Sequence, residues 1–297
     1  MSESLLILAG MPRGGESTWK TTYEYIIKHL DSDLAICYGD NIEMPSYLLE
    51  IAKYNWKFKE PSDWKDYYIE NYSKNALDYL ELGKDTGLEN SGLIGFAIKD
   101  IIRKKYIDIL NNYDQIIFSR YDLFHVDFHP ILDNQYLWIA EGEDYGGVND
   151  RHFIFPSKFS SEILNICSYI DSKESLKKLP KLVNTESVWF KHLENNGLDK
   201  YINRYKRHYF TVSAPGDFTR WRVAEYSLYF SKGLKIKYPN EFLISVKRLL
   251  EKYNLFSILR SSFLLYYNYK VLNLRKKYAK FFPRILKNYV KSKINNI

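Results

Sequence analysis

Short apolar runs alternate with amphipathic stretches along the first 120 residues of the chain. Residues 5–9, 34–38 and 115–119 are short, mainly apolar runs that end at glycine or polar residues, as buried strands do. Between them, residues 19–30 and 92–110 carry apolar side chains at helical spacing. This order of strands and helices, with short connections, predicts an α/β fold with parallel strands.

The rest of the chain continues the pattern less regularly. Residues 43–90 mix Tyr, Trp and charged residues, and we expect a helical and loop insertion there. The following segments predict strands at 152–155 and 207–213, helices at 160–170 and 186–197, and helices over 240–297 that are interrupted at Pro283. We therefore expect a catalytic domain over residues 1–240 and a helical extension over 241–297.

Composition narrows the class of protein. The chain has 297 residues, of which 45% are hydrophobic, so it can bury a large core and is not a disordered chain. Its two cysteines, Cys37 and Cys167, exclude a disulfide scaffold and suit a reducing compartment. Neither a signal peptide nor an apolar window of about 20 residues is visible, so we expect a cytoplasmic protein that does not span a membrane.

The net charge of +7 conceals two oppositely charged parts. From Lys252 to the C-terminus there are 11 basic residues and no Asp or Glu. The remaining 251 residues hold 32 basic and 36 acidic side chains, a net charge of −4. The body is therefore mildly acidic and has no recognisable nucleic-acid-binding module, so nucleic acid is not an expected partner.

A glycine-rich loop follows the first predicted strand. Gly10 to Ser17 read Gly-Met-Pro-Arg-Gly-Gly-Glu-Ser, a spacing similar to a phosphate-binding P-loop, but Glu16 stands where the lysine belongs and would repel a triphosphate. The run also resembles the cofactor loop of sulfotransferases. Ligands of open α/β sheets collect at the carboxyl ends of strands, so Arg13, Gly14 and Gly15 are candidates for approaching a nucleotide or its phosphates. A simple turn between strand and helix is the alternative.

Acidic residues follow the other two predicted strands. Asp40 comes after the second strand and can accept a hydrogen bond from a base or ribose, or simply form a turn. Arg120 and Asp122 follow the third strand. Asp122 is a candidate ligand for a divalent cation that bridges two phosphates, and Arg120 can neutralise a leaving diphosphate. His125, Asp127 and His129 are a second, weaker metal candidate, with polar loop packing as the alternative.

The segment from Glu141 to His152 reads Glu-Gly-Glu-Asp-Tyr-Gly-Gly-Val-Asn-Asp-Arg-His. Four carboxylates within ten residues, among three glycines, offer groups for hydroxyl binding and general-base chemistry. A solvated acidic loop is the alternative, but the apolar residues that follow favour a place for Asp150 at the edge of the core.

These motifs together resemble a group of bacterial and viral glycosyltransferases. The likeness covers about residues 5–170 and rests on residues 8–16, on Arg120 and Asp122, and on the segment from Glu141 to His152. It implies a GT-A-like, Rossmann-related mixed sheet flanked by helices, and a nucleotide-diphosphate sugar, with a UDP-sugar expected, as donor. The usual Asp-x-Asp metal motif is altered here, because Arg120 replaces the first acid, so Mn²⁺ or Mg²⁺ dependence stays open. By the same resemblance, Asp150 is the expected base or acceptor-binding acid, with Asp144 second.

The basic tail has its own pattern. One helical face carries Lys277, Lys280, Arg284, Lys287 and Lys291, and aromatic and apolar residues cover the other. Such a helix is typical of binding to an anionic membrane surface, and docking on the body or oligomerisation is the alternative. We therefore expect a glycosyltransferase peripheral on the inner face of the membrane that acts on a glycan or lipid-linked acceptor in surface polysaccharide biosynthesis. A sulfotransferase-like enzyme and a non-enzymatic glycan- or membrane-binding protein are the alternatives.

Overall fold

The structure is a computed structural model of the 297-residue chain, and it describes residues 3–217, 227–228 and 231–253. The chain divides into two compact units, Met1–Arg248 and Leu249–Ile297, of which the first is described below. The predicted amphipathic helix of the basic tail lies outside the described residues. Of the helices that the structure describes, none combines the length and the apolar character needed to cross a bilayer.

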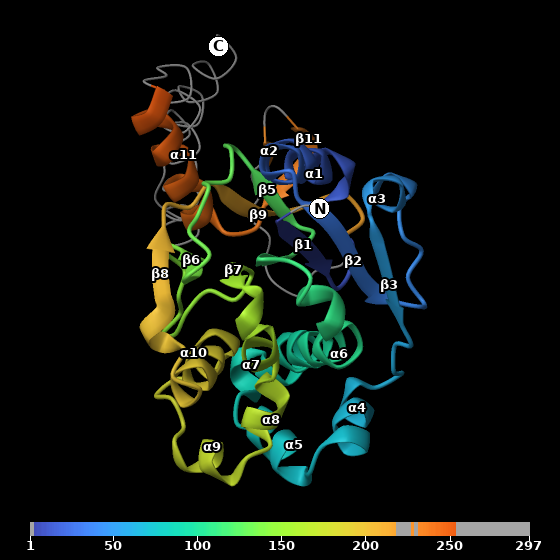
Figure 1. Cartoon of the computed structure of the whole chain (residues 1–297), viewed down its shortest axis with the longest axis vertical. Coiled ribbons are helices and arrows are strands. Elements are labelled where there is room, and N and C mark those ends of the chain that lie inside the picture. The colour runs from blue at the N-terminus through green and yellow to red at the C-terminus, as the bar shows by residue number, and fades with distance from the viewer. Residues whose placement is uncertain (1–2, 218–226, 229–230, 254–297) are drawn as a thin grey trace, which may run out of the picture. The chain divides into compact units, whose positions relative to one another are not determined.

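A seven-stranded mixed sheet forms the centre of the first unit (Figure 1). In spatial order its strands are β3 (Tyr54–Phe58), β2 (Asp33–Gly39), β1 (Ser4–Ala9), β4 (Gln115–Ser119), β7 (His152–Pro156), β6 (Leu137–Ala140) and β8 (Ile202–Tyr205). Within this sheet β7 pairs antiparallel with β4 and β6, and the other four pairs are parallel. The α/β class and a mixed sheet flanked by helices are confirmed, and the arrangement is compatible with a Rossmann-like fold.

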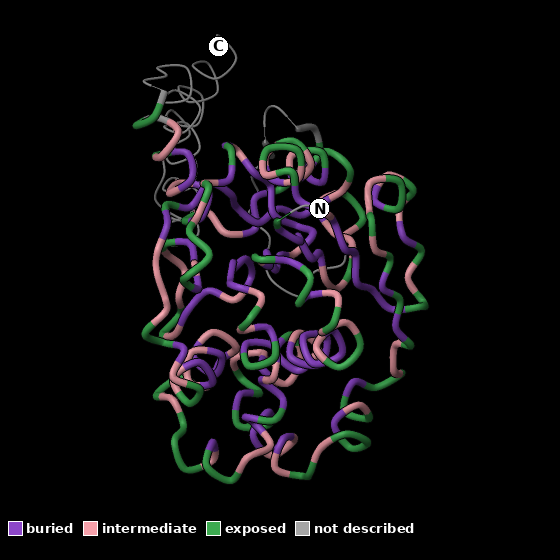
Figure 2. Tube along the Cα trace, in the orientation of Figure 1, coloured by how far each residue is buried: buried purple, intermediate pink, exposed green. Residues whose placement is uncertain are grey.

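The central strands form where the apolar runs lie because both faces of the sheet are covered. Leu5 and Ile7 of β1 belong to one core cluster, whereas Leu6 and Leu8 belong to a second cluster on the opposite face. Figure 2 shows this burial as a continuous band along the central strands. The continuous apolar run in the sequence therefore reports a strand that is buried on two sides.

Helices cover both faces of the sheet (Figure 1). The first face carries α4 (Trp64–Asn71), α5 (Lys74–Glu81), α6 (Leu93–Leu110), α7 (Ser160–Leu164), α8 (Ile166–Ile170) and α10 (Thr185–Asn195). The second face carries α1 (Gly15–Thr22), the π-helix η1 (Tyr23–Ile27), α2 (Lys28–Leu30) and α3 (Ser46–Ile51). Shorter or peripheral elements are η2 (Lys84–Thr86), η3 (Leu88–Gly92), η4 (Ser157–Phe159), α9 (Lys173–Lys177), η5 (Asp199–Tyr201) and α11 (Pro239–Tyr253).

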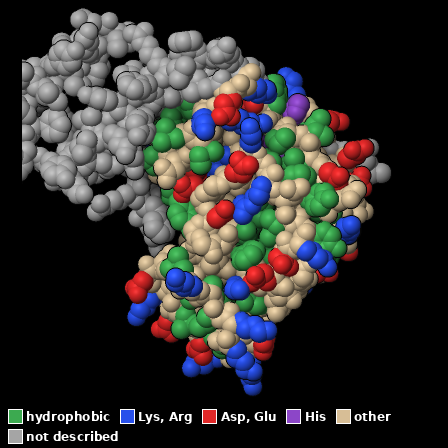
Figure 3. Space-filling model, turned by 90° about the vertical axis from the view of Figure 1, so that its left-hand side faces the viewer, with side chains coloured by type: hydrophobic (Ala, Val, Ile, Leu, Met, Phe, Trp, Pro, Cys, Tyr) green, Lys and Arg blue, Asp and Glu red, His purple; other side chains and the backbone are tan. Residues whose placement is uncertain are grey.

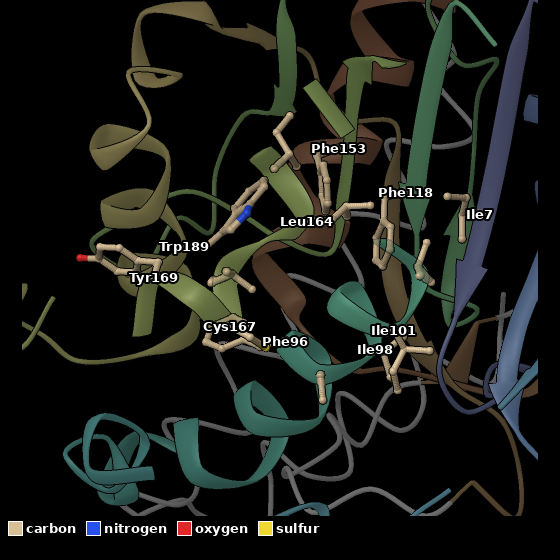
Figure 4. Packing of buried hydrophobic residues seen from close by; sticks show 14 of the residues in the cluster. Ile7, Phe96, Ile98, Ile101, Phe118, Phe153, Leu164, Cys167, Tyr169 and Trp189 are labelled. Carbon is tan, nitrogen blue, oxygen red and sulfur yellow. The ribbon is translucent and has the colours of Figure 1, made fainter. Parts of the chain in front are cut away.

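Aromatic rings fill the space between the sheet and the helices of the first face (Figure 4). Phe118 of β4 stacks on Phe153 of β7 with ring centroids 5.1 Å apart, and Phe153 also contacts Trp189 of α10 at 4.5 Å. This packing fixes β7 between β4 and α10. It therefore determines where the loop that precedes β7 emerges.

A smaller four-stranded sheet lies beside the main one. Its order is β10 (Ser227–Leu228), β11 (Ser231–Ile236), β9 (Tyr209–Ser213) and β5 (Leu123–His125), and all three pairs are antiparallel. The predicted parallel pairing of the first strands is confirmed, since β1 pairs parallel with β2 and β4, and β7 is the strand that makes the sheet mixed. The prediction for residues 43–90 missed β3, and the helix predicted over 160–170 is interrupted at Asn165.

Candidate functional site

Two of the predicted loops meet where the parallel strands β1 and β4 end. The register pairs Leu8 of β1 with Ser119 of β4, so the glycine-rich loop and the segment Arg120–Asp122 leave the sheet side by side. From this point β2 and β3 extend to one side and β7, β6 and β8 to the other. Such a switch point, at the carboxyl ends of strands, is where open α/β sheets bind their ligands.

The glycine-rich loop packs directly on the segment after β4. Gly14 has a φ of +92°, and a Cβ there would lie 3.1 Å from the Cα of Asp122 and 3.2 Å from the carbonyl oxygen of Tyr121. The Gly14 N–H donates to the Asp217 carboxylate (2.9 Å), and the Trp19 indole donates to the carbonyl of Arg13 (3.0 Å). Both contacts hold the peptide unit between Arg13 and Gly14. Gly15 also has a positive φ, +74°.

Arg120 and Asp122 form a two-point ion pair. Arg120 Nε donates to Oδ1 at 2.9 Å and Nη2 to Oδ2 at 2.5 Å. The Asp122 side chain is only 3% exposed, whereas that of Arg120 is 29% exposed. Burial alone would raise the pKa of Asp122, but Arg120, Lys237 and Arg13 together hold that pKa below its usual value. Asp122 is therefore a buried anion, and Arg120 keeps part of its guanidinium accessible.

Two further cations face the same carboxylate. Lys237, which directly follows β11, has a 3% exposed side chain with Nζ 4.0 Å from Asp122 Oδ2. Burial, and then the charge of Arg120, lowers the pKa of Lys237 to about 7. Burial, and then Arg120, also lowers the pKa of Arg13, whose buried Nε has no hydrogen-bond partner within the described part of the chain. The three cations outnumber the two carboxylates that act on them, Asp122 and, at Arg13, Asp217, so this cluster is suited to an anion such as a phosphate.

The surroundings of Asp122 do not fit a divalent cation. Both carboxylate oxygens are bound by Arg120, and the next charged groups are cations, which repel a metal ion. Among the described residues there is also no group of three or more His, Cys, Asp or Glu side chains placed to hold a metal. We therefore derive no chemical step through a metal ion.

Asp40 has a local partner of its own. Its Oδ1 accepts from the backbone N–H of Glu60 at 3.0 Å, and its N–H donates to the Phe58 carbonyl. These bonds join the ends of β2 and β3. These contacts support a turn-forming role for Asp40, and its contact with a base or ribose stays a prediction.

The acidic segment after β6 reaches the same edge of the sheet. His152 at the start of β7 pairs with Ser119 at the end of β4, so the preceding loop emerges beside Arg120. Asp150 is 14% exposed and pairs with the buried Lys99 of α6 at 3.1 Å. Asp144 turns instead toward β8, where Arg204 lies 2.9 Å away. The two predicted catalytic acids therefore face different elements.

The structure adds three charged residues to this edge that the sequence did not single out: Arg151, Glu186 and Glu241. Arg151 pairs with Glu241 of α11 and, at 3.5 Å, with Glu186 of α10. Its charge also acts on Lys237 and Arg120, which links the acidic segment to the cation cluster. Arg151 lies inside the quoted motif, but Glu186 and Glu241 come close only through the fold, so no local pattern marks them.

Burial and the neighbouring charge of Asp150 raise the pKa of Glu186 to about 7, and Arg151 opposes the rise. A carboxyl group with this pKa can take up or release a proton near neutrality.

The predicted histidines lie in the core. His125 and His129 are packed with His152 and His208, with ring centroids 5.0–6.1 Å apart in the recorded pairs. All four are at most 1% exposed. Asp127 instead lies 3.8 Å from Arg248. The proposed metal set of His125, Asp127 and His129 therefore does not come together.

Comparison of the chain with models of protein families finds no model that matches, and comparison with curated proteins finds no similar one.

Proposed function

We propose that the chain is a GT-A-like glycosyltransferase that moves a sugar from a nucleotide-diphosphate sugar to a glycan or lipid-linked acceptor in surface polysaccharide biosynthesis. The observation that carries the proposal is the cluster of Arg13, Arg120 and Lys237 at the switch point of the sheet. A diphosphate is a dianion, and guanidinium groups bind phosphate oxygens with charge-assisted hydrogen bonds. Carboxylates of the kind that proton transfer needs lie nearby, at Asp150 and Glu186.

In this proposal the cation cluster acts on the leaving group. Breaking the bond between the sugar and the phosphate adds negative charge to the released nucleoside diphosphate. Arg13, Arg120 and Lys237 offset that charge in a largely buried place, where electrostatic stabilisation is stronger than in water. The site then has a protein cation where related reactions employ a metal ion, and activity without Mn²⁺ or Mg²⁺ is the expected consequence.

The first experiment is a thermal-shift and calorimetric screen with UDP-glucose, UDP-galactose, UDP-N-acetylglucosamine and GDP-mannose, with and without Mn²⁺. We expect one of them to bind, and Arg13→Gln to weaken that binding at least tenfold. Arg103→Gln is the matched control, because Arg103 is similarly exposed but pairs with Asp100 on α6, outside the cluster. Adenosine 3′-phosphate 5′-phosphosulfate in the same screen tests the sulfotransferase alternative. Binding of that compound alone would replace our proposal.

The membrane part of the proposal rests on the sequence of the basic tail. The face of the body seen in Figure 3 carries acidic and basic side chains interspersed, so this face does not present a single-sign basic patch to an anionic surface. We propose that residues 270–297 hold the enzyme peripherally on the inner face of the cytoplasmic membrane. Sedimentation with vesicles of phosphatidylcholine and phosphatidylglycerol should recover the full chain but not a chain that ends at residue 269. Equal recovery of both would contradict this part.

A further inference from the structure

Two carboxylates lie together where the acidic loop meets the start of α10. The Val148 N–H donates to the Glu186 carbonyl at 3.3 Å, and Asn184, the N-cap of α10, donates from its amide to the Tyr145 carbonyl at 2.8 Å. A Cβ on Gly147 would lie only 2.1 Å from the Glu186 carbonyl oxygen. The loop is thus pressed against the first turn of the helix, which keeps Asp150 close to Glu186.

The two acids differ in how their charge is balanced. Asp150 accepts from the Lys99 ammonium at 3.1 Å, and Lys99 is 3% exposed and surrounded by the rings of Phe96, Phe118 and Phe153. Removing the Asp150 carboxylate would leave that buried ammonium without its ion-pair partner, which is costly. Asp150 is therefore committed to the ion pair with Lys99.

The ion pair of Glu186 with Arg151 is longer than that of Asp150 with Lys99. Glu186 Oε1 is 3.5 Å from Arg151 Nη2, whereas Arg151 also donates directly to Glu241, an acid with no exposed side-chain surface. Glu241 is further bound by Arg207 and Thr211. Arg151 therefore keeps a fixed partner when Glu186 gains a proton. Of the described residues, Asp150 and Arg151 act on Glu186 with their charges, and they pair in turn with Lys99 and Glu241.

Glu186 is also next to the cation cluster. Its partner Arg151 interacts with Lys237 and Arg120, and the Arg151 guanidinium lies 4.5 Å from the ring centroid of Tyr238, which directly follows Lys237. Arg151 thus connects the Glu186 carboxyl group electrostatically with the cation cluster. The proposed reaction requires the sugar on the diphosphate bound there to extend toward Glu186.

We propose that Glu186, rather than Asp150, is the base of the transfer reaction and that Asp150 is a positioning residue beside it. This inference rests on the proposed function. The acceptor hydroxyl oxygen forms a bond to the anomeric carbon of the donor, and its proton passes to a Glu186 carboxylate oxygen. The bond from that carbon to the phosphate oxygen breaks, and its electron pair leaves with the nucleoside diphosphate.

The test uses the full chain and hydrolysis of the four sugar nucleotides named above, with water as acceptor. Glu186→Gln should bind the hydrolysed donor within about threefold of wild type but lose turnover by 10²-fold or more, as loss of a general base does. Glu194→Gln, on the same helix and paired with Lys191 at the surface, is the matched control and should keep wild-type turnover. Added formate should restore part of the turnover of Glu186→Gln only.

A pH profile separates the two roles. Turnover of the wild type should rise with pH as Glu186 ionises, and Asp150→Asn should move this rise to lower pH because it removes a negative charge beside Glu186. Full turnover of Glu186→Gln, or an unmoved profile in Asp150→Asn, would overturn the inference about Glu186 and leave the proposed function standing. Failure of the wild type to bind any of the donors would overturn both.

Discussion

The α-carbon of Asp122 lies where a side chain on Gly14 would have to go, 3.1 Å from its Cβ position. The two residues come from loops that are more than 100 residues apart in sequence and that follow adjacent parallel strands. This contact sets the distance between Arg13 and Arg120, the two half-buried cations of the site. The phosphate-binding geometry that we propose therefore depends on a glycine at position 14.

We expect Gly14→Ala to disturb both the fold and the site. An alanine there adopts a φ of +92°, which costs about 1–3 kcal/mol of stability, and also pushes on the Asp122 backbone. The affinity for the sugar nucleotide should fall as well, because the displaced Asp122 backbone carries Arg120 with it. Gly197→Ala is the matched control, because Gly197 also has a positive φ (+64°) but nothing lies within 4 Å of its Cβ position. Equal losses of stability and binding in the two variants, measured by urea unfolding and calorimetry, would contradict the packing argument.

Asp122→Asn should lower stability and yet strengthen anion binding. Removing one partner of a buried ion pair costs about 3–5 kcal/mol, and the partial exposure of Arg120 favours the lower end. Arg120 and Lys237 lose their shared counter-charge, so UDP-glucose should bind more tightly in the absence of metal. Asp78→Asn, in the exposed pair with Lys74, is the control and should change the free energy of unfolding by less than about 1 kcal/mol. Two results together would instead support a metal at Asp122: Asp122→Asn binds UDP-glucose more weakly than the wild type, and Mn²⁺ strengthens binding by the wild type but not by the variant.

An element or site residue can be predicted from the sequence when its role depends on residues close to it along the chain. The apolar runs of β1, β2 and β4 are buried on both faces and were predicted, as was the place of Arg13 and Arg120 at their ends. β3 was missed because its side chains alternate between buried and half-buried or exposed, with Lys57 among aromatic residues, as at the edge of a sheet. Glu241 meets Arg151 across 90 residues of sequence, and only the completed fold brings such a pair together.

The pH dependence of stability should reveal Lys237. Its pKa in the fold is about 7, below the unfolded value of about 10.4, so between these values the unfolded chain binds more protons and stability rises with pH. Lys237→Met should therefore gain stability relative to wild type below pH 7, and the gain should vanish as the pH approaches 10. Lys235→Met, an exposed position on the same strand, should show no such trend. A gain that does not change with pH would contradict a depressed pKa.

The same lysine should link donor binding to pH. A bound diphosphate favours the ammonium form of Lys237, so affinity should fall as the pH rises through 7. UDP-glucose is a suitable probe, because its diphosphate diester has no group that titrates near neutrality. Calorimetry in buffers with different ionisation enthalpies should detect proton uptake on binding at pH 7.5 by the wild type and not by Lys237→Met. Equal proton uptake by both would assign the linkage to another group.

Acid should unfold the protein through its buried histidines, which are the four of the core cluster and, apart from them, His192 of α10, whose pKa burial lowers to about 4. Burial lowers the pKa of His125 to about 3 and of His129 to about 4, and it holds the pKa values of His152 and His208 well below the usual value. The folded state therefore keeps these rings neutral, whereas the unfolded chain takes up protons below about pH 6.5. Their contribution to stability is complete above that pH and is lost as the pH falls toward 4.

The slope of stability against pH measures how many of these rings are involved. Each ring contributes about 1.4 kcal/mol per pH unit below pH 6.5, so four together contribute at most about 5–6 kcal/mol per pH unit. His208→Gln should reduce this contribution to the slope by about a quarter, whatever its effect on stability at pH 8. The reason is that the unfolded variant has one fewer ring that binds a proton where the folded protein does not. His29→Gln is the control, since that ring is exposed in the fold. Urea unfolding at pH 8, 6.5 and 5.5 provides the slopes, and equal slopes for wild type and His208→Gln would show that His208 can be protonated in the folded state.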